Sequence, residues 1–211
     1  MNPTTPPAGL ILAGGRGLRW GGQDKGLIVW REQPMASHVA SHLRPWCAPL
    51  VVSCNRNQTA YAGIADFTVS DAEDTFEGPL AGLLAALDDP RLAAAELLLT
   101  SPCDTPLLGA EYPRRMLNHP SAGGRILVAG SGTHRHFLHM LLPCRYRDSL
   151  ATYFAAGGRS VKNWLATTEH EFVHFDDQPE CFANFNSSID LPVSGHPSDG
   201  GNPITGNRAE E

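Results

Sequence analysis

The sequence lacks several features that would assign it to a large class of proteins. Its five cysteines form no Cys-x-x-Cys pair, which argues against a zinc site or a dithiol redox centre, and their odd number favours reduced thiols. No apolar run approaches the ~18–20 residues of a membrane-spanning helix, and the first nine residues have neither the basic nor the apolar region of a signal peptide. We therefore expect a soluble, cytoplasmic protein that does not enter a membrane.

Excess positive charge is also missing. The chain has 16 Lys and Arg against 22 Asp and Glu, a net charge of -6, whereas a nucleic-acid-binding protein would need a basic stripe. The four tryptophans are scattered and form no stacking platform for single-stranded nucleic acid. No Gly-x-Ser-x-Gly turn or other nucleophile motif is present, so covalent acyl transfer has no support. These absences favour a small anionic ligand over a nucleic acid.

A glycine-rich, cationic loop follows the first apolar run of the chain. Five of the nine residues after Ala13 are glycines, whose backbone can approach an anion closely and whose N–H groups can form an anion-binding nest. Three cations accompany them: Arg16, Arg19 and Lys25. Trp20 stands where a dinucleotide fingerprint has its third glycine, and Lys25 lacks the neighbours of a Walker loop. A plain surface turn needs only one or two glycines, so the loop predicts phosphate binding.

Short apolar runs alternate with amphipathic stretches of helical length. We expect strands at 10–13, 50–53, 67–69, 96–100, 125–129, 137–142 and 171–175. We expect helices at 35–46, 80–88, 112–118, 147–156 and 160–167. This alternation predicts βαβ units and a mainly parallel sheet in a single domain over residues 1–191. Residues 192–211 are almost devoid of apolar side chains and are expected to form a disordered tail.

Polar residues follow several of the expected strands, at the edge where open parallel sheets bind ligands. Asp104 lies between two prolines after the leucine-rich strand, and a carboxylate fixed there can hold Mg²⁺ against phosphate oxygens. The alternative for Asp104 is an Asx turn or a helix N-cap. Asp71 directly follows another strand and is a candidate for a nucleotide sugar or a metal. The glycine loop, residues 53–57 and residues 101–106 are therefore expected to open toward one crevice.

Three histidines, at positions 134, 136 and 139, resemble a metal cluster at first sight. On a regular strand, residues two apart share a face, whereas His139 would point to the opposite side from His136. Three-fold ligation of zinc is then geometrically poor. We expect a structural or substrate-contact role for these histidines.

The motifs taken together resemble those of the molybdenum cofactor guanylyltransferases, the MobA family. The first match is the run Leu-Ala-Gly-Gly-Arg-Gly-Leu-Arg-Trp-Gly-Gly-Gln-Asp-Lys-Gly-Leu at 12–27. The others are Asn-Arg-Asn at 55–57 with Tyr61, Gly-Pro-Leu-Ala-Gly at 78–82, Pro-Cys-Asp-Thr-Pro at 102–106, Gly-Arg-Ser-Val-Lys at 158–162 and Phe-Ala-Asn-Phe-Asn at 182–186. The chain departs from the family at Trp20, where methionine is usual, at Ser53, where asparagine is common, and at His136-Phe137, where His-Pro is typical.

The resemblance implies a three-layer, Rossmann-like nucleotidyltransferase fold and a transfer reaction. GMP from GTP would join the terminal phosphate of molybdenum-molybdopterin, giving the guanine dinucleotide cofactor and pyrophosphate by Mg²⁺-assisted in-line attack. GTP and molybdenum-molybdopterin are then the substrates, and molybdoenzyme chaperones or other cofactor-biosynthesis proteins are the expected partners. The alternatives are a cytidylyltransferase for the same cofactor, a sugar-1-phosphate nucleotidyltransferase, and a non-catalytic protein that stores or delivers the cofactor.

The resemblance also assigns roles to individual residues. Lys25 would bind the nucleotide phosphates and Asp104 would bind Mg²⁺. We expect Arg19 to act on the departing pyrophosphate, so that the catalytic residues are Arg19, Lys25 and Asp104. The GTP-binding residues would be Leu12, Ala13, Gly14, Gly15, Lys25, Ser53, Asn55, Asp71 and Asp104. Asn184 and Asn186 would lie on the molybdopterin side.

Overall fold

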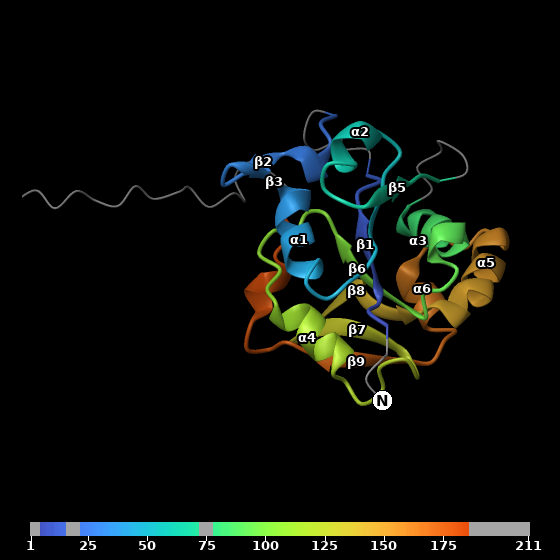
Figure 1. The fold of residues 1–211 in the computed structure, drawn as a ribbon. Coiled ribbons are helices and arrows are strands. Elements are labelled where there is room, and N and C mark those ends of the chain that lie inside the picture. Colours follow the sequence, from blue (N-terminus) through green and yellow to red (C-terminus); the bar gives the residue numbers. More distant parts are fainter. Residues whose placement is uncertain (1–4, 16–21, 72–77, 186–211) are drawn as a thin grey trace, which may run out of the picture.

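A seven-stranded mixed sheet forms the centre of the computed structural model, which describes residues 5–15, 22–71 and 78–185 (Figure 1). Its order is β5-β4-β1-β6-β8-β7-β9. The strands are β1 (Ala8–Leu12), β4 (Leu50–Ser53), β5 (Phe67–Val69), β6 (Leu97–Pro102), β7 (Ile126–Ser131), β8 (His134–Pro143) and β9 (His170–His174). Neighbouring strands are parallel except that β8 runs antiparallel to both β6 and β7. The prediction of a mainly parallel sheet is confirmed, with β8 as its exception.

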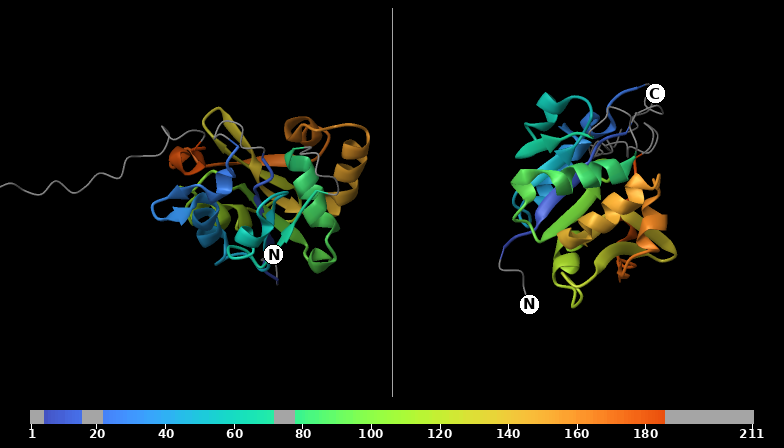
Figure 2. Two further views of the ribbon diagram at one scale, coloured as in Figure 1. Left: turned by 90° about the horizontal axis from the view of Figure 1, so that it is seen from above. Right: turned by 90° about the vertical axis from the view of Figure 1, so that its right-hand side faces the viewer.

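Helices cover both faces of this sheet, which gives the predicted three layers. On one face lie α1 (Met35–Leu43), α2 (Gln58–Tyr61) and α4 (Glu111–Leu117), and on the other lie α3 (Pro79–Asp88), α5 (Arg147–Ala155) and α6 (Val161–Leu165). Every residue of β1, β4, β6 and β7 is buried, as expected for strands that are covered on both sides. Figure 2 shows α3 and α5 packed beside each other on the second face. No helix in the described part of the chain is long and apolar enough to cross a membrane.

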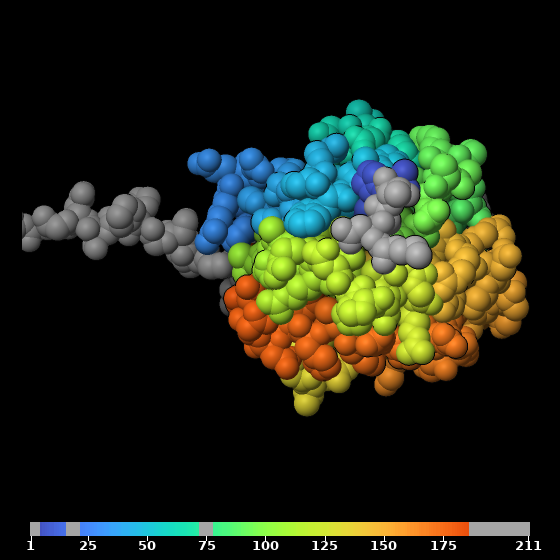
Figure 3. Space-filling view, turned by 60° about the horizontal axis from the view of Figure 1, so that its bottom comes forward, coloured from blue at the N-terminus to red at the C-terminus, as the bar shows by residue number. Residues whose placement is uncertain are grey.

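On the face that carries α1, the part of the sheet near β9 is covered by α4 and the segment that follows β9. Figure 3 shows these two segments, yellow-green and orange, side by side on that face. Arg115 of α4 joins them, since its guanidinium donates to the His174 carbonyl at 3.3 Å and to the Asp177 carboxylate. Here the two segments contribute packing and surface ion pairs, and Phe185, at the end of the second segment, reaches the loop after β6.

Short elements account for most differences from the expected secondary structure. A hairpin of β2 (Val29–Trp30) and β3 (Gln33–Pro34) precedes α1, and 3₁₀-helices stand at η2 (Lys25–Leu27), η3 (Pro90–Leu92), η4 (Cys144–Tyr146) and η5 (Pro179–Phe182). Two- to four-residue elements are too short to show a hydrophobic period. The hairpin turn also places Arg31 and Glu32 at φ 45° and 69°, where glycine or asparagine is the usual signal. The helix expected at 35–46 ends at Leu43, and the one expected at 160–167 covers Val161–Leu165.

The histidines of β8 do not follow the expected alternation. Val128 of β7 pairs with Met140 and the next residue, Ala129, pairs with His136, so residues 137–139 have no partners on β7. This irregularity brings the His136 and His139 rings to 6.0 Å, and both pack on Phe182 at 4.3 and 4.9 Å. The prediction that His139 points away from His136 is wrong, because it assumed an unbroken two-residue period.

Candidate active site

Loops after β1, β4, β5 and β6 border one cleft of about 290 Å³. The chain passes from β1 to β4 on one side and reaches β6 on the other, so the cleft lies at the switch point of the strand order, where open α/β sheets bind ligands. Its lining residues are Leu12, Ala13, Gly14, Gly15, Lys25, Ser53, Asp71, Gly78, Pro79, Gly82, Pro102, Cys103, Asp104 and Leu138. The expectation that the three polar loops open toward one crevice is confirmed.

Lys25 and Asp104 meet across this cleft. The Lys25 ammonium forms an ion pair with Oδ2 of Asp104, although the two residues are 79 positions apart in the sequence. Lys25 is the first residue of η2, and Asp104 follows β6. The side chains are only 21% and 15% exposed, so solvent screens the pair weakly. A fixed cation and a fixed anion therefore face the same ligand volume.

The loop that carries Asp104 is held from two sides. The Cys103 N–H donates to the Leu12 carbonyl at 3.1 Å, and the Phe185 N–H donates to the Asp104 carbonyl at 3.0 Å. The Asp104 side chain caps no helix, because the next helix begins at Glu111 with Ala110 at its N-cap. The alternative of a helix N-cap is therefore wrong, and an Asx turn is excluded because residue 106, two positions on, is a proline without an N–H. Oδ1 of Asp104 is buried without a hydrogen-bond partner, so one carboxylate oxygen is available to a ligand.

Asp71 and Asn55 form a second polar pair in the cleft wall. The Asn55 amide donates to Oδ2 of Asp71 at 2.8 Å, and the Asp71 N–H donates to Oδ1 of Asn55 at 3.0 Å. This reciprocal pair joins the loops after β4 and β5. Ser53 is 2% exposed and packs against Gly82, where an added Cβ would lie 2.3 Å from the Ser53 hydroxyl oxygen. The α3 backbone can approach β4 this closely only because residue 82 is glycine.

The first part of the glycine-rich loop borders the same space. Ala13 continues the sheet, since its N–H donates to the Ser53 carbonyl at 2.8 Å. A Cβ added at Gly14 or Gly15 would meet nothing within 4 Å, so at these two residues the backbone faces open volume. Arg16, Arg19 and Trp20 lie outside the described residues, as does Asn186. Asn184 is exposed and directly precedes Phe185, which is bonded to the Asp104 loop, but Asn184 does not line the cleft.

Behind Asp104 lies a buried network that sequence reasoning missed. His139 is 3% exposed, and its Nε2 lies 3.2 Å from the Thr105 hydroxyl, which in turn donates to the Pro102 carbonyl at 3.3 Å. Burial and, to a lesser degree, His136 lower the pKa of His139 to about 3, so the imidazole is neutral. The network thus supports the Pro102–Asp104 turn without adding charge. No alternation rule could have found it, because the β8 irregularity creates it.

Sequence reasoning also left Asp24, Arg56, Asn57 and Tyr61 without a role. The structure joins all four to the segment around Lys25. The run Asn-Arg-Asn at 55–57, directly after a buried strand, was the available signal for this contact, but it does not reveal the partner.

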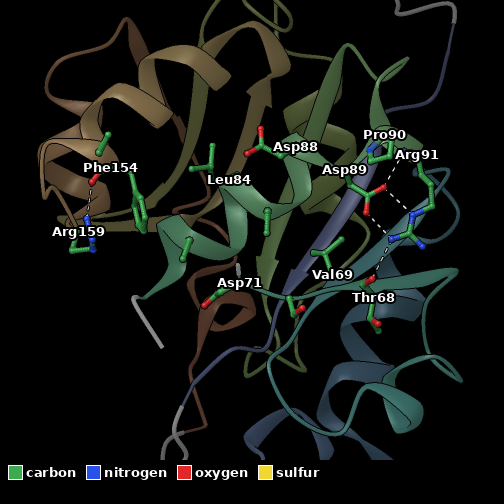
Figure 4. Close-up of a pocket in the computed structure, with 14 residues that line it drawn as sticks. Thr68, Val69, Asp71, Leu84, Asp88, Asp89, Pro90, Arg91, Phe154 and Arg159 are labelled. Atoms are coloured by element: carbon green, nitrogen blue, oxygen red, sulfur yellow. Dashed lines mark hydrogen bonds and ion pairs between the residues drawn. The ribbon is translucent and has the colours of Figure 1, made fainter. Parts of the chain in front are cut away.

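A second hollow of about 790 Å³ adjoins the cleft through Asp71, which lines both. In Figure 4, Leu84 and Asp88 of α3 form its floor, with Arg159 and Arg91 on opposite sides. Arg91 is bound to Asp89 by two hydrogen bonds of 2.6 and 2.8 Å, and Arg159 donates to the Phe154 carbonyl at 2.8 Å. We place the active site in the smaller cleft because it holds Lys25, Asp104 and the glycine backbone.

Comparisons with known proteins identify the family to which this fold belongs. A family model described as a MobA-like NTP transferase domain matches residues 9–172. A molybdenum cofactor guanylyltransferase from Shewanella putrefaciens is 38% identical over 179 residues, which cover 84% of this chain and 90% of that protein. Molybdopterin-guanine dinucleotide biosynthesis protein A from Archaeoglobus fulgidus superposes with a TM-score of 0.70 at 19% identity, covering 87% of this chain and 94% of that one. Rv0371C of Mycobacterium tuberculosis, crystallised as a complex with manganese, has a TM-score of 0.59 at 16% identity, with coverages of 81% and 89%.

The fold, the cleft and these matches together define a nucleotidyltransferase. The chain belongs to the MobA-like NTP transferase family, whose model covers more than half of its length.

Proposed function

We propose that the protein transfers GMP from GTP to the terminal phosphate of molybdenum-molybdopterin, giving the guanine dinucleotide cofactor and pyrophosphate. The observation that carries the proposal is the meeting of Lys25 and Asp104 across a cleft floored by glycine backbone. The similarity to molybdenum cofactor guanylyltransferases supports this choice of base and acceptor. In the reaction, a phosphate oxygen of the acceptor bonds to the α-phosphorus of GTP, and the bond from that phosphorus to the β-phosphate bridge oxygen breaks.

The acceptor phosphate is already ionised, so the site needs no strong general base. Its tasks are to align two anions and to balance their charge. The Lys25 ammonium supplies a fixed positive charge for the nucleotide phosphates. Before a nucleotide binds, its ion pair with Asp104 holds the ammonium in the cleft. Arg19 is proposed to act on the departing pyrophosphate.

Asp104 is proposed to bind a divalent cation, and the cation proposed is Mg²⁺. Oδ1 of Asp104 is buried and has no partner, which fits a ligand role for that oxygen. Among residues 5–15, 22–71 and 78–185 no cluster of three or more His, Cys, Asp or Glu could form a cage. One carboxylate completed by substrate phosphates and water is the arrangement that Mg²⁺ prefers. When bound, the cation would neutralise developing negative charge on the phosphates.

The nucleoside is proposed to bind along the β1, β4 and β5 loops. Its proposed contacts are Leu12, Ala13, Gly14, Gly15, Ser53, Asn55 and Asp71. Asn184 and Asn186 are proposed to contact molybdopterin, and the exposed position of Asn184 beside the Asp104 loop supports this. The proposal also places the reaction in the cytoplasm, as the free cysteines suggest, with molybdoenzyme chaperones receiving the product.

The test is pyrophosphate release by the purified protein with Mg²⁺ and one nucleotide–acceptor pair at a time. We expect release with GTP and molybdenum-molybdopterin, together with formation of the guanine dinucleotide. A preference for CTP would make the protein a cytidylyltransferase for the same cofactor. Release with a hexose 1-phosphate instead would make it a sugar nucleotidyltransferase, and GTP binding without any pyrophosphate would indicate a storage protein.

A further inference from the structure

We propose that residues 55–61, between β4 and the end of α2, form a positioning bracket for the nucleotide site. The bracket fixes the separation of Gly15 and Gly22, the described residues on either side of the glycine-rich loop, and the place of Lys25. It rests on the proposed nucleotide site, since it acts through the residues that would bind phosphates. None of its residues lines the cleft; Asn55, at its beginning, contacts Asp71, which does.

Arg56 provides one half of the bracket. Its Nη1 donates to the Gly22 carbonyl at 3.1 Å, and its Nη2 donates to the Gly15 carbonyl at 3.3 Å. A single planar guanidinium therefore reaches two backbone groups on either side of the loop. Lysine presents one compact charge and cannot reproduce this fork. The separation of Gly15 and Gly22 is thus set by the shape of one side chain.

Asp24 accepts the remaining hydrogen bonds of the bracket, from Asn57 and Tyr61. Its Oδ1 accepts from the Tyr61 hydroxyl at 2.5 Å and from the Gly26 N–H at 3.3 Å, and its Oδ2 accepts from the Asn57 amide at 3.1 Å. Both carboxylate oxygens are therefore occupied by protein donors. Asp24 is the N-cap of η2, the 3₁₀-helix that begins with Lys25. The donors on α2 and its N-cap hence hold the turn from which the Lys25 side chain extends.

Gly26 is tightly packed between the bracket and the loop that carries Asp104. A Cβ added at Gly26 would lie 2.4 Å from the Tyr61 hydroxyl oxygen and 3.1 Å from Cβ of Cys103. Gly26 is thus wedged between the bracket and the residue that directly precedes Asp104. Tyr61 is fully buried, and burial raises its pKa well above the ordinary value, so the hydroxyl stays protonated and donates. The bracket and the Asp104 loop together fix Lys25 from two sides.

The expected effect of the bracket is on binding. When only a fraction of molecules holds the binding-competent arrangement, the apparent dissociation constant rises by the inverse of that fraction. At saturating GTP the nucleotide restores the arrangement, so kcat is preserved. We expect Arg56→Ala to weaken GTP binding about tenfold and Tyr61→Phe to weaken it about threefold, each with kcat within about twofold.

The experiment compares Arg56→Ala, Arg56→Lys and Tyr61→Phe with the wild-type protein. Calorimetry gives the Kd for GTP with Mg²⁺, and hydrogen exchange reports the amides of residues 22–27 in the nucleotide-free protein. The matched control is Arg145→Ala, because Arg145 donates to the Gly123 carbonyl at 2.6 Å and also to the Gly124 carbonyl, far from the cleft. We expect weaker binding and faster exchange in all three bracket variants, and wild-type values for the control.

Three results would overturn the proposal. The first is an unchanged Kd in both Arg56→Ala and Tyr61→Phe. The second is full rescue by Arg56→Lys, which would mean that charge and not the fork matters. The third is a large fall in kcat at unchanged Kd, which would make these residues part of the chemistry. If Arg56→Ala fails to fold, the Kd and the hydrogen exchange of Tyr61→Phe decide whether the proposal stands. Wild-type protein that binds GTP but transfers no GMP would refute the proposed function and leave the bracket test intact.

Discussion

Replacing Asp104 with asparagine gives the most direct test of the site. Asparagine keeps the volume of the side chain and removes its charge, so the turn after β6 keeps its packing. The Asp104 side chain is 15% exposed, Oδ1 is shielded from water, and Oδ2 pairs with Lys25. Charges in such a setting act more strongly than the ~0–1 kcal/mol of an exposed pair. The substitution should therefore affect the reaction far more than a surface substitution does.

We expect the transfer rate of Asp104→Asn to fall at least ~100-fold, as it does when one preorganised electrostatic group is lost. This corresponds to about 2.7 kcal/mol of transition-state stabilisation. The affinity for GTP in metal-free buffer, in contrast, should not fall. Removing the carboxylate takes away the anion that competes with the phosphates for the Lys25 ammonium, so GTP should bind the variant at least as tightly as the wild type.

Single-turnover release of pyrophosphate from GTP with Mg²⁺ and molybdenum-molybdopterin measures the first effect, and calorimetry with EDTA measures the second. The control is Asp177→Asn, which removes an exposed partner of Arg115 at the far end of the sheet. A variant that transfers GMP within tenfold of the wild-type rate would refute the role of Asp104 as the cation ligand. Weaker metal-free binding would refute the assignment of Lys25 to the phosphates.

Three further predictions concern single residues. Glu32→Gly should stabilise the protein by about 1 kcal/mol in urea unfolding, because Glu32 has φ 69° and glycine adopts this region without strain; a lower midpoint would contradict it. His139→Gln should flatten the pH dependence of stability. The pKa of His139 is about 3 in the folded state and near 6.5 in the unfolded state, so its full contribution to the free energy of unfolding is present only above about pH 6.5. In the wild type only, this contribution falls by about 2 kcal/mol from pH 7 to pH 5. Equal slopes in wild type and variant would show that His139 does not titrate this way. Gly82→Ala should weaken GTP binding, because its Cβ would lie 2.3 Å from the Ser53 hydroxyl oxygen; addition of Ser53→Ala should restore part of the loss, and unchanged binding by Gly82→Ala would refute the close fit.

Long, continuously apolar segments made most of the fold predictable. The strands at 50–53 and 67–69 were expected with their observed limits, whereas the strand expected at 96–100 runs from Leu97 to Pro102. The hydrophobicity of β4 and β6 reflects burial on both faces, which is a local signal. The antiparallel direction of β8 follows from the two-residue turn at Gly132 and Thr133, which joins β7 and β8 as a hairpin. The expected strands at 125–129 and 137–142 left this turn out.

The site was predictable where a glycine-rich or polar segment follows a buried strand. Lys25 and Asp104 were both expected at one cleft, and the ion pair confirms this. The bracket was not predictable, because its hydrogen bonds, except the one between Asp24 and Gly26, join residues that are 33 or more positions apart. The prediction that His139 points away from His136 was wrong because three residues of β8, 137–139, have no partners on β7 and interrupt the two-residue period.

The place of β1 in the strand order has a consequence for how such enzymes can diversify. The loops after β4 and β5 lie on one flank of β1, and the loop after β6, with Phe185 bonded to it, lies on the other. With the nucleoside and the pterin bound as proposed, mutations that change recognition of one substrate can accumulate in loops that do not contact the other. Lys25 and Asp104 lie between these two sets of loops and contact each other, so mutations on either side must preserve this ion pair.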